Sequence, residues 1–157
     1  MIELPMRAFC LDGVNGSDKI EMTIDHVFDF PEQTSFRGGY DLFGDIIIRA
    51  GGYTVHSSNI TSSTGRLHDF LVSLTHCYNL LSGVARFESC PYERNLELTL
   101  TMVDLGHTVI DGYFRENFMF PNDLIFGFHT DQTYILRAIS DLKQVEKLFD
   151  DNKGKQI

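Results

Sequence analysis

The stretch NDLIFGFHTDQTYI (residues 122–135) decides the fold class, because its apolar period changes from that of a strand to that of a helix. Leu124, Phe126 and Phe128 occupy every second position, which predicts a strand with an aromatic face. Asp131 can accept hydrogen bonds from the free amides of a first helical turn. The apolar residues that then recur on one side are Ile135, Ile139, Leu142 and Phe149. We therefore predict a strand that feeds a helix packed back on its sheet.

Outward from this stretch, period-two patterns predict further strands over residues 20–30, 42–50, 53–60, 84–88, 96–102 and 109–115. A bulge is expected near His26, where the alternation of the first of these strands is broken. Gly51 and Gly52 suit a two-residue hairpin turn. A second helix, beginning near Thr64 and capped by Gly83, follows from the spacing of Leu67, Phe70, Leu71, Leu74, Tyr78 and Leu81.

The order of these elements predicts an α+β fold. Short connections favour antiparallel neighbours, so we expect a mostly antiparallel sheet with two amphipathic helices packed on one face. A chain of 157 residues is long enough for one core without metal or disulfide support. We expect a single domain over residues 1–149 and a polar tail over residues 150–157.

The net charge of −9 is unevenly distributed. Residues 1–45 hold three basic and nine acidic side chains, whereas residues 131–157 hold five of each. Such a field repels nucleic acid and favours a cationic partner. Solubility alone is the simpler explanation of the same charge.

The chain has the features of a cytoplasmic protein. Residues 1–20 contain no apolar run preceded by positive charge, and no later stretch has the length needed to cross a bilayer. The three cysteines, Cys10, Cys77 and Cys90, are odd in number and widely spaced, which suits a reducing compartment and inert thiols.

No catalytic, metal or cofactor site is expected. His68 and His76 lie eight residues apart, which is not the spacing at which two imidazoles of one helix share an ion. His129 could pair with Asp131 as a general base, yet no activated nucleophile accompanies it. We do not expect an enzyme.

Four motifs in order resemble the WapI-type immunity proteins: RAGGY at Arg49, LSG at Leu81, LGH at Leu105 and residues 122–135. The resemblance covers residues 36–149. It implies a small cytosolic protein that protects its cell from the toxin of a neighbour-inhibition system. Such proteins act by stoichiometric binding that blocks the active site or the substrate path of the toxin, and the best-known partner toxin attacks tRNA.

A nuclease toxin carries basic surface for phosphates, so acidic side chains are the candidate contacts. Glu21, Asp25 and Asp29 would lie on one side of a regular strand, successive carboxylates about 13 Å apart. Asp41 and Asp45 complete the predicted set. The alternative is a solvated face balanced by Arg or Lys on a neighbouring strand.

Two other functions remain open. The chain could be an adaptor that uses a sheet edge or the loop of Phe118, Met119 and Phe120, although we expect that loop to fold onto the sheet. It could also hold a small ligand in a pocket between the helices and the sheet.

Overall fold

The computed structural model describes residues 2–90, 95–116 and 119–149. Its elements are, in chain order, β1 (Met6–Asp12), β2 (Lys19–Val27), β3 (Asp41–Ala50), β4 (Tyr53–Ser63), α1 (Thr64–Leu80), β5 (Gly83–Glu88), β6 (Leu96–Met102), β7 (His107–Arg115), β8 (Asp123–Asp131) and α2 (Gln132–Phe149). The tail predicted over residues 150–157 lies outside the described residues.

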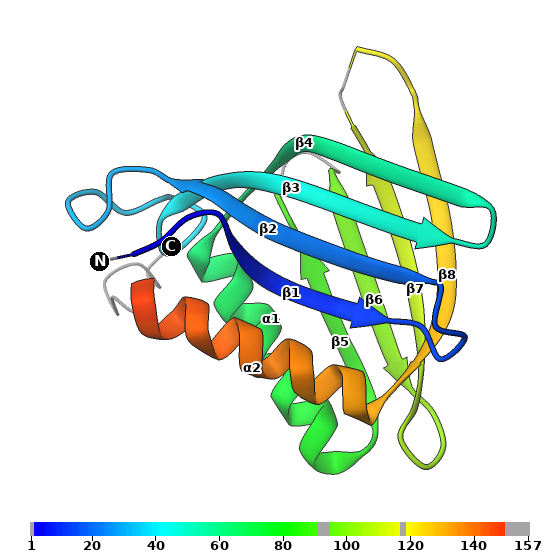
Figure 1. Cartoon of the computed structure of the whole chain (residues 1–157). Helices are drawn as coiled ribbons and strands as arrows, with labels where there is room; N and C mark the ends of the chain where they lie inside the picture. Colours follow the sequence, from blue (N-terminus) through cyan, green and yellow to red (C-terminus); the bar gives the residue numbers. More distant parts are fainter. Residues whose placement is uncertain (1, 91–94, 117–118, 150–157) are drawn as a thin grey trace.

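The strands form two antiparallel sheets of four, each a meander of strands that follow one another along the chain. The first sheet has the order β1-β2-β3-β4 and the second β5-β6-β7-β8, and α1 connects them (Figure 1). The α+β class is confirmed. The division into two sheets was not apparent from the sequence. Local patterns predict which neighbouring strands form hairpins, but the position at which one sheet ends depends on how α1 places the next strand in space.

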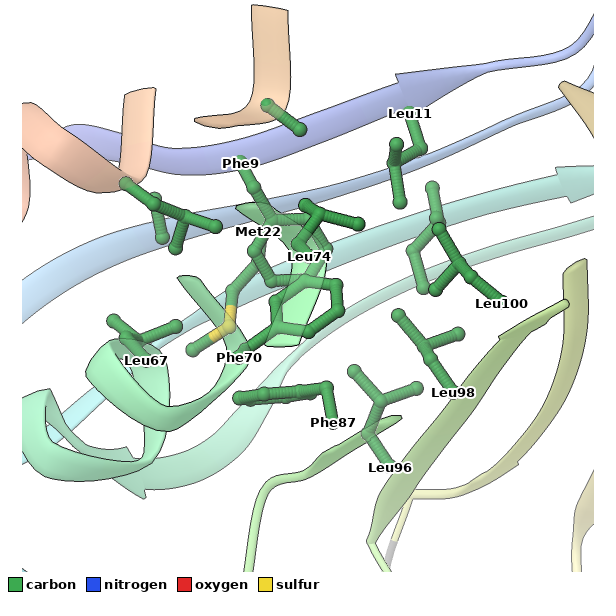
Figure 2. Close-up of a cluster of buried hydrophobic side chains, with 14 of the residues drawn as sticks. Phe9, Leu11, Met22, Leu67, Phe70, Leu74, Phe87, Leu96, Leu98 and Leu100 are labelled. Atoms are coloured by element: carbon green, nitrogen blue, oxygen red, sulfur yellow. The ribbon is translucent and has the colours of Figure 1, made fainter. Parts of the chain in front are cut away.

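Both helices lie on the same side of the fold, where α2 packs along β1, α1 packs along β5, and the helices contact each other (Figure 1). The rings of Phe9, Phe70 and Phe87, from β1, α1 and β5, meet with centroids 5.2, 5.4 and 5.6 Å apart (Figure 2). Their tilted and edge-on contacts are the favoured arrangements of aromatic pairs. One buried apolar cluster therefore joins both sheets to both helices.

The strand-to-helix transition predicted near Asp131 is confirmed. The Asp131 carboxylate accepts hydrogen bonds from the backbone amides of Thr133 at 2.9 Å and Tyr134 at 3.4 Å. The aromatic face of β8 is buried, as are the predicted apolar positions of α2: Phe126, Phe128, Ile135, Ile139, Leu142 and Phe149. The two-residue period thus marks the buried face of β8, and the helical period that follows marks the buried face of α2.

The strand β1 was not predicted. Four consecutive residues, Ala8 to Leu11, are buried, so the stretch lacks the alternation of a half-exposed strand. The reason is that α2 packs along β1, whereas the predicted strands have an exposed face. Continuous burial removes the period on which sequence analysis depends.

The predicted ends of α1 are displaced. Ser63, rather than Thr64, is the N-cap, and its hydroxyl accepts a hydrogen bond from the amide of Arg66. The helix ends at Leu80, and Leu81 takes the left-handed conformation with φ of 52°. The prediction that Gly83 caps this helix is wrong, because Gly83 is already the first residue of β5.

Candidate partner-binding face

A bulge in β2 shapes the outer face of the first sheet. The register against β3 shifts between Ile24 and His26, which makes Asp25 the additional residue and confirms the expected bulge. Beyond the shift, His26 lies opposite Phe43, whose side chain is exposed on the outer face. Asp25 and His26 are therefore neighbours on one face instead of alternating.

The same bulge overturns the expected row of Glu21, Asp25 and Asp29 along a regular strand. The strand ends at Val27, and Asp29 lies in the following turn with φ of 55°. A shift of one residue also moves Phe28 from the inner face, where its even position had placed it, to the outer face. Sequence analysis thus missed an aromatic side chain of this face.

Three aromatic rings cluster on this outer face. The ring of His26 lies 4.5 Å from that of Phe28 and 5.9 Å from that of Phe43, and the two phenylalanine rings are 5.7 Å apart, centroid to centroid. Phe28 is 41% exposed and Phe43 is 37% exposed. Contiguous exposed apolar rings are typical of interaction surfaces.

A pair of carboxyl groups adjoins these rings. Burial raises the pKa of Asp25 above its ordinary value, and a hydrogen bond with Asp45 and the charge of that group raise this pKa further. Nε2 of His56, on β4, lies 3.7 Å from a carboxylate oxygen of Asp45. Among the described residues, no Lys or Arg forms an ion pair with either carboxylate. We refer to Asp25, His26, Phe28, Phe43 and Asp45 as the acidic–aromatic patch.

The other acidic residues predicted for partner binding have different surroundings. Glu21 lies 3.5 Å from the guanidinium of Arg7 and 3.9 Å from the ammonium of Lys19. Asp41 lies 3.7 Å from the guanidinium of Arg37. Both carboxylates are therefore balanced by cations of the same chain, whereas Asp25 and Asp45 lie against each other.

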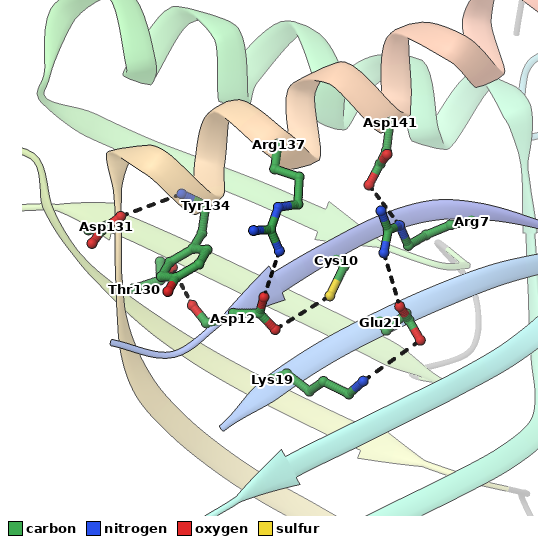
Figure 3. A network of polar contacts seen from close by, with 10 residues as sticks. All are labelled: Arg7, Cys10, Asp12, Lys19, Glu21, Thr130, Asp131, Tyr134, Arg137 and Asp141. Carbon is green, nitrogen blue, oxygen red and sulfur yellow. Dashed lines mark hydrogen bonds and ion pairs between the residues drawn. The ribbon is translucent and has the colours of Figure 1, made fainter. Parts of the chain in front are cut away.

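Near α2 the acidic groups belong to a network that fastens this helix to β1 (Figure 3). Arg7 lies 3.0 Å from the carboxylate of Asp141 and also contacts Glu21. Arg137 donates to Asp12 at 2.8 Å, and the Thr130 hydroxyl donates to the backbone carbonyl of Asp12 at 2.7 Å. This network closes the fold between its first and last elements.

The described part of the chain contains no group of three or more His, Cys, Asp or Glu that could hold a metal ion. The three cysteines are free and buried. Burial raises the pKa of Cys10 to about 12, with further contributions from the charges of Asp12 and Glu21. Its thiol is therefore protonated at neutral pH and a poor nucleophile.

Two other surfaces bear on the alternatives drawn from the sequence, although the groove is lined by the two helices and not by helices and sheet as expected. A groove of about 540 Å³ lies between the two helices and is lined by His68, Leu71, Val72, Thr75, Lys143, Glu146 and Lys147. In the loop after β7, Met119 is 84% exposed and Phe120 is 62% exposed, so the expectation that they fold onto the sheet is wrong. Phe118 lies outside the described residues.

The outer face of the first sheet thus combines exposed aromatic rings, which are enriched in protein-binding surfaces, with two acids that form no ion pair with a described Lys or Arg. The chain belongs to the immunity protein WapI-like family, whose model matches residues 11–150. This result confirms the resemblance seen in the sequence motifs. No match was found among curated proteins or among solved structures. In the described part of the chain, no helix is both long and apolar enough to span a membrane.

Proposed function

We propose that this protein neutralises a basic, nuclease-type toxin in the cytosol by stoichiometric binding, without catalysis of its own. Family membership supports toxin neutralisation in general. The observation that carries the finer proposal is the acidic–aromatic patch, whose two carboxylates form no ion pair with a described Lys or Arg of their own chain. A basic partner can supply the missing charge.

Electrostatics also supports this choice of partner. The chain carries a net charge of −9, and its acidic excess is greatest in residues 1–45, which include β1, β2 and the start of β3. A nuclease that binds phosphates presents the complementary charge, so attraction would accelerate association and direct the toxin to this face. The five predicted contacts remain Glu21, Asp25, Asp29, Asp41 and Asp45.

The test uses the toxin domain expected from the gene immediately upstream and measures association at increasing salt. We expect the association rate to fall about tenfold between low and physiological ionic strength. Replacing Asp25 and Asp45 of the patch, together with Asp29 of the adjoining turn, by Ser should lower the affinity; we call this variant the patch triple. A matched control replaces Asp69, Asp104 and Asp111, which are exposed elsewhere on the molecule, by Ser.

Each outcome addresses a different part of the proposal. If the control triple lowers the affinity as much as the patch triple, net charge rather than this face attracts the toxin. If the patch triple binds as the unaltered protein does, the face is wrongly assigned. If no complex forms with the unaltered protein, or if the purified chain turns over a substrate alone, the proposed function is wrong.

The second candidate is an adaptor that docks an apolar partner through the loop after β7. The exposure of Met119 and Phe120 favours it. Such binding should change little with salt, because it depends on apolar burial. Replacing both residues by Ser should abolish adaptor binding and leave toxin affinity unchanged.

A further inference from the structure

The arrangement of the acidic–aromatic patch suggests which chemical group it receives. Two carboxyl groups within hydrogen-bond reach of each other repel once both are ionised, and in this pair Asp25 is already partly buried. Two imidazoles adjoin these acids: His26 belongs to the patch, and Nε2 of His56 lies 3.7 Å from a carboxylate oxygen of Asp45 and carries charge only if protonated. The patch therefore lacks a permanent positive charge between its acids and its rings.

We propose that the patch is a receptor for a single arginine side chain of a protein partner, with the guanidinium between Asp25 and Asp45 and its flat face against Phe28 and Phe43. This inference rests on the proposed function, since the partner is the toxin.

Arginine fits this patch better than lysine for a geometric reason. A guanidinium is planar and has five N–H donors in a fixed fork, so it can donate to two carboxylates at once. It also stacks on aromatic rings, which an ammonium group does less readily. The exposed parts of Phe28 and Phe43 offer such a surface beside Asp45, which is two residues from Phe43 on the same face of β3.

The bulge makes this combination possible. In a regular strand Asp25 and His26 would point to opposite faces, and Phe28 would be buried with the core. With the bulge, His26 lies opposite Phe43 of β3, the ring of Phe28 just after β2 lies 5.7 Å from that of Phe43, and Asp25 shares a hydrogen bond with Asp45. Functional surfaces of sheets are often built on such irregularities.

The first test needs no toxin. The probe is the peptide acetyl-Gly-Arg-Gly-amide, titrated into protein labelled with ¹³C at the Asp carboxyl and Phe ring carbons, with the citrulline peptide as a neutral control of the same shape. We expect saturable shifts at Asp25, Asp45, Phe28 and Phe43 with a dissociation constant on the order of 1–10 mM. Asp45→Asn should weaken binding about tenfold, and Asp111→Asn, on the exposed face of β7, should not.

Equal binding of the citrulline peptide, the absence of saturable shifts at the patch, or equal shifts at Asp111 would overturn the arginine receptor. A second measurement separates this inference from the proposed function. With the toxin domain, Asp45→Lys should reduce the affinity at least about a hundredfold, and Asp111→Lys should reduce it much less. If the toxin binds Asp45→Lys unchanged, the proposed function stands and the receptor is wrong.

Discussion

Acidic side chains have opposite surroundings at the two ends of β2. Near the start of the strand, Glu21 lies between Arg7 and Lys19, and Arg7 also reaches Asp141 on α2 (Figure 3). Near the end, Asp25 has another acid as its neighbour. The difference teaches that net charge favours a basic partner without locating its contacts, whereas the neighbours of each carboxylate separate groups that hold the fold from groups open to a ligand.

The acids at the two ends of β2 also differ in their effect on stability. Ion pairs next to the helix replace some of the hydration that Asp141 loses on burial, although burial still raises the pKa of Asp141 above its ordinary value. At the other end of β2, no Lys or Arg of the described part of the chain offsets the repulsion between Asp25 and Asp45, and His56 beside Asp45 carries charge only if protonated. Removing the charge of Arg7 should therefore lower the free energy of unfolding, whereas removing the charge of Asp25 should raise it.

The largest effect is expected from a change that separates β2 from β3 beside the patch. A Cβ on Gly44 would lie 1.7 Å from the backbone carbonyl oxygen of Thr23, so the strands must move apart. We expect Gly44→Ala to lower the free energy of unfolding by about 1–3 kcal/mol and to reduce toxin binding. Urea denaturation measures the first effect. Gly52→Ala is a control, because nothing lies within 4 Å of its added Cβ.

An intermediate effect is expected where the acids are paired. Arg7→Ala leaves Glu21 and the partly buried Asp141 without this cation, so stability at pH 7 should fall by about 1–2 kcal/mol. The loss should shrink at low pH, because burial raises the pKa of Asp141 and this carboxyl then loses its charge. Urea denaturation at pH 7 and near pH 3 checks this, and a loss that is equal at both pH values would contradict the assigned role of the ion pairs.

The smallest effect, of opposite sign, is expected at Asp25. Its pKa is raised in the folded protein, so the folded state binds this proton more tightly than the unfolded state. Stability from this group is greatest below the ordinary Asp pKa of about 3.9 and is lost as pH rises through the raised value. Asp25→Asn should thus stabilise the protein at pH 7 by less than about 1 kcal/mol. A destabilised variant at pH 7 would show that the repulsion is already relieved.

The acidic side chains of the candidate face could be predicted from the sequence, but its full aromatic content could not. The acidic residues and the bulge near His26 followed from the pattern, whereas the outward position of Phe28 did not. A bulge reverses the side-chain period beyond it, and only pairing with β3 shows which residue is the additional one. The ion pairs of Glu21 and Asp141 with Arg7 could not be predicted either, because Arg7 belongs to β1, a strand that the sequence pattern did not indicate.

The sequence by itself determined the α+β class, the turn at Gly51, both helices and the transition at Asp131, because each depends on local periodicity, backbone conformation or capping. Only the tertiary structure decided the division into two sheets, the buried strand β1 and which acids lie beside an Arg or Lys. These features depend on contacts between residues far apart in the chain. A local pattern carries no information on which distant cation, ring or helix a side chain will meet.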